Sequence, residues 1–145
     1  HCPEIIGLDD NKNAWLDMLM THVIEPALPK YCLVFIYDYP ASQASLARIN
    51  GEVAERFELY VNGVELANGF HELADAKEQR QRFESEIRFR QQSGQTPVDY
   101  DEHLIAALQS GLPACSGVSI GFDRLVMLAT GADRIEQVQW TPVGG

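Results

Sequence analysis

The sequence predicts an α+β fold in which helices flank an antiparallel β-sheet. Asn62-Gly63 separates two alternating runs and is the strongest short signal of a β-hairpin, because a type I′ turn needs positive φ at both central residues. The run at 31–37 is continuously apolar and β-prone, which is typical of a buried strand. Helical spacing of apolar residues at 15–24 and of charged pairs at 75–92 adds two helices.

The composition is that of a globular protein and argues against two broad classes. The chain has 145 residues, 46% of them hydrophobic, which suits a single domain (1–145) with its own core. No apolar run approaches the ~20 residues that span a bilayer and no signal peptide is visible, so we expect no membrane association. Lys and Arg number 11 against 21 Asp and Glu, a net charge of −10, which argues against a broad nucleic-acid-binding surface.

The cysteines indicate a reducing environment. Cys2, Cys32 and Cys115 are far apart and form no C-x-x-C motif. They complete no metal-ligand spacing with the histidines. We therefore expect free thiols and a cytoplasmic location.

The N-terminal third reads as a helix followed by a strand. Residues 9–11 (Asp-Asp-Asn) offer N-cap side chains for the helix at 15–24, and Pro26 and Pro29 are expected to end it. The strand at 31–37 follows, and a loop of small residues leads from it to the hairpin.

The hairpin turn sets a register that places two glutamates together. Opposed residues share a face, so Glu58 and Glu65 become diagonal neighbours with backbones about 7–8 Å apart. Tyr60 and Ala67 lie on the same face. The expected pairs are Val61–Val64, Tyr60–Glu65, Leu59–Leu66 and Glu58–Ala67, which direct Phe57, Leu59, Val61, Val64 and Leu66 toward the core.

Two carboxylates on an inner sheet face are costly unless a cation or a donor lies between them. Mg²⁺ carried by a nucleotide fits, because hard cations take a few carboxylates together with phosphate oxygens. A solvated face with two glutamates of no function is the open alternative. Asn68 and Glu72 lack the parity of Glu65 and need a bulge, which Gly69 is placed to supply, to reach the same pocket.

The C-terminal half predicts three helices, including the one at 75–92, and two strands. A long helix begins at the Asp75 cap and carries Glu78–Arg82, Glu84–Arg88 and Glu86–Arg90 pairs at i,i+4 spacing. The remaining elements are a helix at 101–109, a strand of small residues at 115–121, a helix at 122–130 stopped by Gly131, and a strand at 135–140.

The strand-to-helix turn at 117–124 suits an anionic ligand. Its glycines permit close approach of a flat ligand, and a helix N-terminus with Arg124 in its first turn favours phosphate. The pattern is neither a dinucleotide-binding fingerprint nor a P-loop. The open alternative is that the glycines serve packing and Arg124 pairs with Asp123.

Three segments together resemble class II aminoacyl-tRNA synthetases of the lysyl type and, more closely, their tRNA-independent branch, the elongation factor P lysine ligases. They are 39–47 (YPASQASLA), 55–72 (ERFELYVNGVELANGFHE) and 115–128 (CSGVSIGFDRLVML), the last being similar to class II motif 3. The resemblance runs from about residue 15 to 140 and implies the antiparallel sheet of that class.

The resemblance also implies roles for individual residues. Glu58 and Glu65 match an acidic pair that binds Mg²⁺, Glu58 with ATP and Glu65 with the amino acid. Arg124 matches the catalytic motif 3 arginine on the ATP γ-phosphate. Leu59 would contact adenosine through its backbone, Gly121 would lie beneath adenine, Asn68 and Phe70 would hold the amino acid, and Glu72 would face its side-chain ammonium.

Ser119 departs from the family pattern, since lysyl-tRNA synthetases have Gly there and the tRNA-independent branch usually has Ala. A larger group on the pocket floor shifts selection among lysine isomers, and a methylene-sized change is worth roughly 1–3 kcal/mol. His71 is expected to be a neighbour of the pocket rather than a participant.

The activity implied is ATP-dependent activation of lysine or (R)-β-lysine as an adenylate, followed by transfer to a lysine of elongation factor P rather than to tRNA. Motifs 1 and 2 are missing, so we expect the C-terminal part of a catalytic domain that cannot activate an amino acid alone. The full-length protein is expected to be a homodimer. The alternatives are the C-terminal half of a lysyl-tRNA synthetase and a non-catalytic interaction module.

Overall fold

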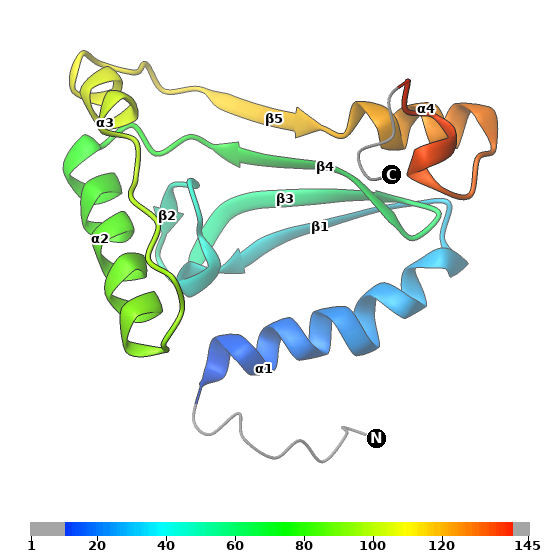
Figure 1. Cartoon of the computed structure of the whole chain (residues 1–145), viewed down its shortest axis with the longest axis horizontal. Helices are drawn as coiled ribbons and strands as arrows, with labels where there is room; N and C mark the ends of the chain where they lie inside the picture. Colours follow the sequence, from blue (N-terminus) through cyan, green and yellow to red (C-terminus); the bar gives the residue numbers. More distant parts are fainter. Residues whose placement is uncertain (1–10, 141–145) are drawn as a thin grey trace.

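The computed structural model describes residues 11–140 and confirms an antiparallel sheet flanked by helices (Figure 1). The strands follow the order β1-β3-β4-β5, and the short β2 pairs with β3 outside this path. Helices α2 and α3 lie at one end of the sheet and α4 at the other (Figure 1). The main elements are α1 (Lys12–Leu19), β1 (Leu33–Pro40), β2 (Ile49–Asn50), β3 (Val53–Val61), β4 (Val64–His71), α2 (Ala76–Gln92), α3 (Glu102–Gln109), β5 (Ser116–Ile120) and α4 (Phe122–Thr130).

The N-terminal helix begins as predicted, but its prolines do not end the helical path. Asn11 caps α1 with a side-chain hydrogen bond, and the other two cap candidates, at 9–10, lie outside the described residues. The chain continues as a π-helical turn (Met20–Ile24) and a 3₁₀ segment (Glu25–Lys30) that contains both prolines. Pro26 lies in the first turn of this segment, where a missing N–H costs little.

The hairpin has the predicted turn. Asn62 (φ 49°) and Gly63 (φ 82°) are both left-handed, as a type I′ turn requires, and Val61 pairs with Val64. This turn is fixed by local backbone preference, because Asn and Gly are the residues that adopt positive φ at low cost.

A bulge at Leu66 changes the register beyond the second pair of the hairpin. It lies three residues before Gly69, where the sequence suggested one. The extra residue turns Asn68 onto the face of Glu58, which the predicted register did not. The observed pairs are Tyr60–Glu65, as predicted, then Leu59–Ala67 instead of Leu59–Leu66, and Glu58–Asn68 instead of Glu58–Ala67.

We expect Gly63→Ala to destabilise the hairpin. A Cβ there would lie 2.6 Å from Pro29 Cγ, and the backbone has a φ of +82°. Left-handed strain and overpacking each cost about 1–3 kcal/mol. Gly51→Ala is the matched control, because φ is +64° there but nothing lies within 4 Å. Urea unfolding should therefore show a larger loss for Gly63→Ala, and equal losses would exclude the Pro29 contact.

The strand β1 is an edge strand and not the doubly buried strand that its apolar run predicted. Leu33, Phe35 and Tyr37 are 55%, 52% and 65% exposed. Their partners on β3 lie on the same side of the sheet, with Phe35 opposite Leu59. The apolar run reflects one open face and one covered face.

The predicted direction of the core was also wrong. Val118 and Ile120 on β5 continue the β1 face and are 54% and 55% exposed. Ala67, which the bulge brings opposite Leu59, is buried on this side. None of the five larger residues predicted to face the core is buried, because within 11–140 no layer covers this side of the sheet. The residues concerned, all intermediate in exposure, are Phe57, Leu59, Val61, Val64 and Leu66.

The two long C-terminal helices, α2 and α4, have the predicted bounds. Asp75 caps α2, accepting hydrogen bonds from two amides at 2.8 and 3.0 Å. Of the three predicted ion pairs on α2, Glu78–Arg82 forms at 2.6 Å. The predicted strand at 135–140 is wrong, because the chain forms a 3₁₀ turn (Ile135–Gln137) there.

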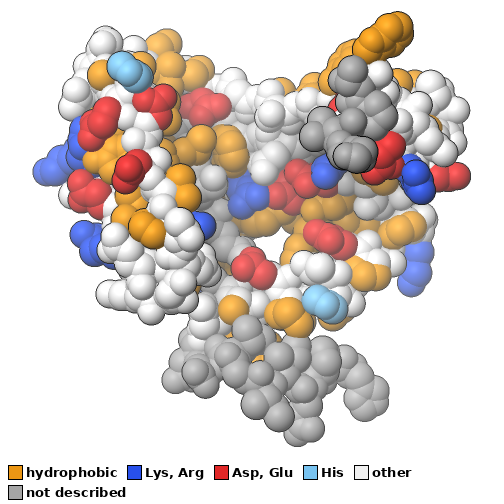
Figure 2. Space-filling model, viewed as in Figure 1, with side chains coloured by type: hydrophobic (Ala, Val, Ile, Leu, Met, Phe, Trp, Pro, Cys, Tyr) orange, Lys and Arg blue, Asp and Glu red, His pale blue; other side chains and the backbone are white. Residues whose placement is uncertain are grey.

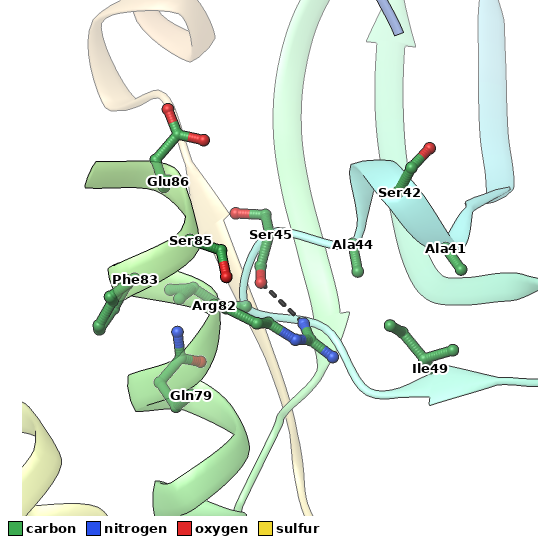
Figure 3. A pocket seen from close by; sticks show the side chains of 11 residues that line it. Ala41, Ser42, Ala44, Ser45, Ile49, Gln79, Arg82, Phe83, Ser85 and Glu86 are labelled. Atoms are coloured by element: carbon green, nitrogen blue, oxygen red, sulfur yellow. Dashed lines mark hydrogen bonds between the residues drawn. The ribbon is translucent and has the colours of Figure 1, made fainter. Parts of the chain in front are cut away.

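Hydrogen bonds from Arg82 connect α2 to the loop after β1. Arg82 donates to the carbonyl oxygens of Ser45 (2.9 Å) and Ala47 (2.8 Å), and Figure 3 shows its guanidinium reaching across from α2. A cavity of about 520 Å³ lies between α2 and this loop. Ala44, Ala47 and Ala54 form a small buried cluster against which Tyr39 and Phe70 pack.

Charges of both signs are interspersed on the face seen in Figure 2, without a broad patch of Lys and Arg. Cys32 and Cys115 carry free thiols, while Cys2 lies outside the described residues. Within residues 11–140, no helix combines the length and the apolar character that a membrane span needs.

Candidate active site

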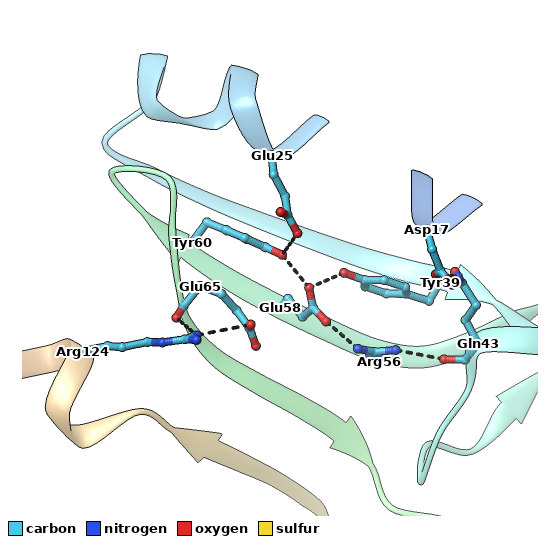
Figure 4. A network of polar contacts seen from close by, with 9 residues as sticks. All are labelled: Asp17, Glu25, Tyr39, Gln43, Arg56, Glu58, Tyr60, Glu65 and Arg124. Carbon is cyan, nitrogen blue, oxygen red and sulfur yellow. Dashed lines mark hydrogen bonds and ion pairs between the residues drawn. The ribbon is translucent and has the colours of Figure 1, made fainter. Parts of the chain in front are cut away.

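Glu58 is the centre of a polar network on the covered face of the sheet (Figure 4). It is 8% exposed, and both of its carboxylate oxygens accept hydrogen bonds. Tyr39 and Tyr60 donate to Oε2 at 2.6 and 2.9 Å, and Arg56 forms an ion pair with Oε1. Such charge-assisted bonds compensate the burial of a carboxylate.

The network also involves elements beyond the strand that carries Glu58. Arg56 donates to the carbonyl oxygen of Gln43 at 3.0 Å, and its guanidinium stacks 4.4 Å from the ring centroid of Tyr39. Tyr60 is also 3.4 Å from Glu25 in the 3₁₀ segment. The predicted register places Tyr60 on this face, but it does not predict the participation of Arg56 and Tyr39. The parity of Arg56, two residues before Glu58, was a usable signal.

Burial raises the pKa of Tyr39 and of Tyr60, and their hydrogen bonds to the Glu58 carboxylate raise it further. The folded protein therefore keeps both phenolic protons at a pH where the unfolded chain, with tyrosine pKa values of about 10, releases them. This contribution to stability is complete below pH ~10 and is lost as the pH rises above it.

We expect the free energy of unfolding to fall between pH 9 and 11, and to fall less steeply in Tyr39→Phe, which has one phenol fewer to hold neutral. Urea unfolding across this range measures both slopes. Parallel slopes would contradict the raised pKa of Tyr39.

Arg124 and Glu65 join the turn before α4 to the hairpin. Arg124 Nη1 donates to the Glu65 carbonyl oxygen at 2.6 Å and to its carboxylate at 3.3 Å. The alternative pairing with Asp123 is not formed, since that carboxylate accepts from Gln139 at 3.1 Å. The side chains of Arg124 and Glu65 are 45% and 37% exposed, and such pairs contribute at most ~1 kcal/mol. An incoming phosphate can therefore compete for Arg124.

A cavity of about 300 Å³ adjoins this pair. Asn68 lies opposite Ser119 across β4 and β5, and both line the cavity. The Asn68 Oδ1 atom is buried and lacks a hydrogen-bond partner among the described residues. A buried acceptor without a donor is costly, and a ligand ammonium or amide would satisfy it. Gly121, the N-cap of α4, lies on the same wall.

Glu72 lies just beyond β4, beside Gly117. A Cβ added to Gly117 would meet Glu72 Oε1 at 2.2 Å, so the carboxylate passes directly over the glycine. The backbone amide of Glu72 bonds to the Cys115 carbonyl oxygen at 3.0 Å. No hydrogen bond or ion pair holds the Glu72 carboxylate within 11–140. It is therefore available to a cation.

The structure gathers most of the predicted residues, though not all. Glu58 lines a cavity of about 460 Å³. Glu65 lines both this cavity and the cavity of about 300 Å³ beside Arg124. Leu59 points to the opposite face, so only its backbone could serve a ligand here. His71 also lies off the site, where its Nδ1 pairs with Glu55 at 2.8 Å. Phe70 packs against the alanine cluster.

The donor set fits Mg²⁺ only when phosphate accompanies the ion. Glu58 and Glu65 line one cavity, and no group of three or more His, Cys, Asp or Glu side chains in the described part could hold a metal. Mg²⁺ commonly uses one or two carboxylates together with substrate phosphates. Glu58 and Glu65 are thus suited to a cation that arrives with a nucleotide.

Known proteins are similar in sequence to this chain over nearly all of its length. The chain is 52% identical over 137 residues to the elongation factor P–(R)-β-lysine ligase of Salmonella arizonae, and 53% over 133 residues to that of Edwardsiella ictaluri. A ligase of the same name from Proteus mirabilis is 51% identical over 142 residues. These matches cover 92%, 90% and 96% of the chain, but 42%, 41% and 44% of the relatives.

The chain thus spans less than half the length of these relatives. The family description of the tRNA synthetases of class II (D, K and N) matches residues 10–143, which is nearly the whole chain. The chain belongs to the class II tRNA synthetase family of the D, K and N type.

Proposed function

We propose that the full-length protein is an ATP-dependent ligase that joins lysine or (R)-β-lysine to a lysine side chain of elongation factor P. The observation that carries this proposal is the Glu72 carboxylate over Gly117, which has no partner within residues 11–140. It lies just beyond the β4–β5 pair that carries the Asn68 oxygen, which likewise lacks a partner there. A carboxylate facing an ammonium is the expected selector for a basic amino acid. The names of the relatives from Salmonella, Edwardsiella and Proteus support the same acceptor.

In the first step, a carboxylate oxygen of the amino acid attacks the α-phosphorus of ATP, and pyrophosphate leaves. Arg124 binds the γ-phosphate and neutralises charge on the departing group. Glu58 and Glu65 would hold Mg²⁺, which would supply positive charge to offset that of the phosphates. Catalysis of this kind is positioning and electrostatic stabilisation, with no covalent enzyme nucleophile.

In the second step, the ε-amine of the acceptor lysine attacks the adenylate carbonyl. An amide forms, AMP leaves, and the amine gives up one proton. Leu59, through its backbone, and Gly121 hold the adenosine in both steps. Asn68 and Phe70 hold the amino acid, and Ser119 forms the floor that distinguishes lysine isomers.

The proposal also covers the rest of the protein, its location, its oligomeric state and its acceptor. The chain is the C-terminal part of a catalytic domain, its complete form is a cytoplasmic homodimer, and elongation factor P replaces tRNA as acceptor. The C-terminal half of a lysyl-tRNA synthetase is the main competing function, because the family also includes lysine-specific tRNA synthetases.

ATP–pyrophosphate exchange tests the activation step. The full-length protein should exchange label in the presence of lysine or (R)-β-lysine, and the isolated 145-residue chain should not. Exchange by the isolated chain would refute the claim that residues outside it are required. A full-length protein inactive with both isomers would favour a non-catalytic interaction module.

A further inference from the structure

Tyr39 reaches the candidate active site through an irregularity in β1. Asp38 has a φ of 56°, and the register between β1 and β3 shifts between Tyr37 and Tyr39. Side chains alternate along a regular strand, so Tyr39 would otherwise share the open face of Tyr37. The left-handed residue instead turns Tyr39 toward Glu58, as Figure 4 shows.

The contacts of Tyr39 are directed at one atom of Glu58. Its hydroxyl donates to Oε2 at 2.6 Å, the shorter of the two tyrosine hydrogen bonds to this oxygen. Its ring lies under the guanidinium of Arg56, which pairs with the other carboxylate oxygen. Tyr39 therefore fixes the carboxylate directly and also through Arg56.

A carboxylate held in this way still has room for a cation. Each carboxylate oxygen can accept about two interactions. Tyr39 and Tyr60 occupy both positions of Oε2, whereas Oε1 accepts from Arg56 alone and keeps one position for a cation. Groups that orient a metal-binding side chain commonly change metal affinity by 10–100-fold when removed.

We propose that Tyr39 is a positioning residue that sets the orientation in which Glu58 meets the Mg²⁺ carried by ATP. This inference rests on the proposed function, in which Glu58 serves the metal–nucleotide complex. Tyr60 contributes less to this orientation. Its hydroxyl donates to Glu58 Oε2 over a longer distance, 2.9 Å, and also lies 3.4 Å from Glu25 Oε1.

The test is isothermal titration calorimetry of the full-length protein with a non-hydrolysable ATP analogue, with Mg²⁺ and with EDTA. Tyr39→Phe should weaken binding about ten-fold or more with Mg²⁺ and leave binding in EDTA within about two-fold of the parent. Tyr60→Phe should show a smaller loss of the same kind, and it keeps the test decisive if Tyr39→Phe does not fold. Tyr100→Phe is the matched control, because its hydroxyl contacts Arg80, away from the site.

Unchanged Mg²⁺-dependent binding in Tyr39→Phe would overturn the proposal. Equal losses with Mg²⁺ and with EDTA would also overturn it, because they would assign Tyr39 a structural role only. A parent protein that binds no Mg²⁺–nucleotide at all would overturn the proposed function itself, and that failure is visible before any variant is measured.

Discussion

Arg124→Ala should lower the rate of lysine-dependent ATP–pyrophosphate exchange in the full-length protein by about 10³-fold. A single preorganised donor to charge that develops in the transition state is worth about 10²–10³ in rate. The side chain is held over the hairpin by Glu65 and lies in the first turn of α4. Because this pair is half exposed, its loss should cost little stability.

Arg134→Ala is the matched control for Arg124→Ala. Arg134 pairs with Glu136 at 3.5 Å and its side chain is 72% exposed, so its removal should leave exchange unchanged. Near-parental activity of Arg124→Ala, with the fold verified by circular dichroism, would remove Arg124 from the reaction.

Gly117→Ala should raise the KM for the amino acid about 10–100-fold and leave the KM for ATP nearly unchanged. The added Cβ would lie 2.2 Å from Glu72 Oε1, so the carboxylate must leave its place over the strand. The loss expected is that of a charge-assisted hydrogen bond, ~1.5–3 kcal/mol. Steady-state exchange assays with each substrate varied in turn give both constants.

Glu72→Gln separates this explanation from general damage to the strand. If Gly117→Ala acts through Glu72, the two changes together should cost little more than either alone. Val118→Ala is the control on the same strand, because Val118 is 54% exposed on the opposite face. Additive losses in the double variant, or a rise in the KM for ATP, would contradict the role of Gly117.

Features fixed by local chemistry could be predicted from the sequence. The Asn62-Gly63 turn follows from backbone preferences at positive φ, and the start of α2 follows from the Asp75 cap. Both depend on a few neighbouring residues. The same is true of α4, whose N-terminus presents Arg124 as expected.

Features fixed by long-range pairing could not be predicted. The bulge at Leu66 carries no distinctive residue, yet it decides that Asn68 shares a face with Glu58. The left-handed Asp38 likewise decides the direction of Tyr39. A register shift of one residue reverses every side chain beyond it, so an irregular position unseen in the sequence misplaces a whole wall of a site.

The resemblance to lysine ligases grouped Asn68 and Glu72 with Glu65 where strand parity did not. Asn68 does line a cavity together with Glu65, whereas Glu72 lines neither of the two cavities that contain Glu65. Burial was harder to judge. An apolar sheet face normally marks a core, but the face of Phe35 and Val118 is open in residues 11–140. The sequence pattern shows that a sheet face is apolar, but it does not show which element, if any, covers that face.

The most direct test of the proposed function is a competition between acceptors. The full-length protein would be incubated with ATP, Mg²⁺ and labelled lysine or (R)-β-lysine, with unmodified elongation factor P and lysine tRNA both present. We predict stable label on elongation factor P and none on the tRNA. Label on the tRNA alone would contradict the account and identify a lysyl-tRNA synthetase with an altered pocket floor at Ser119.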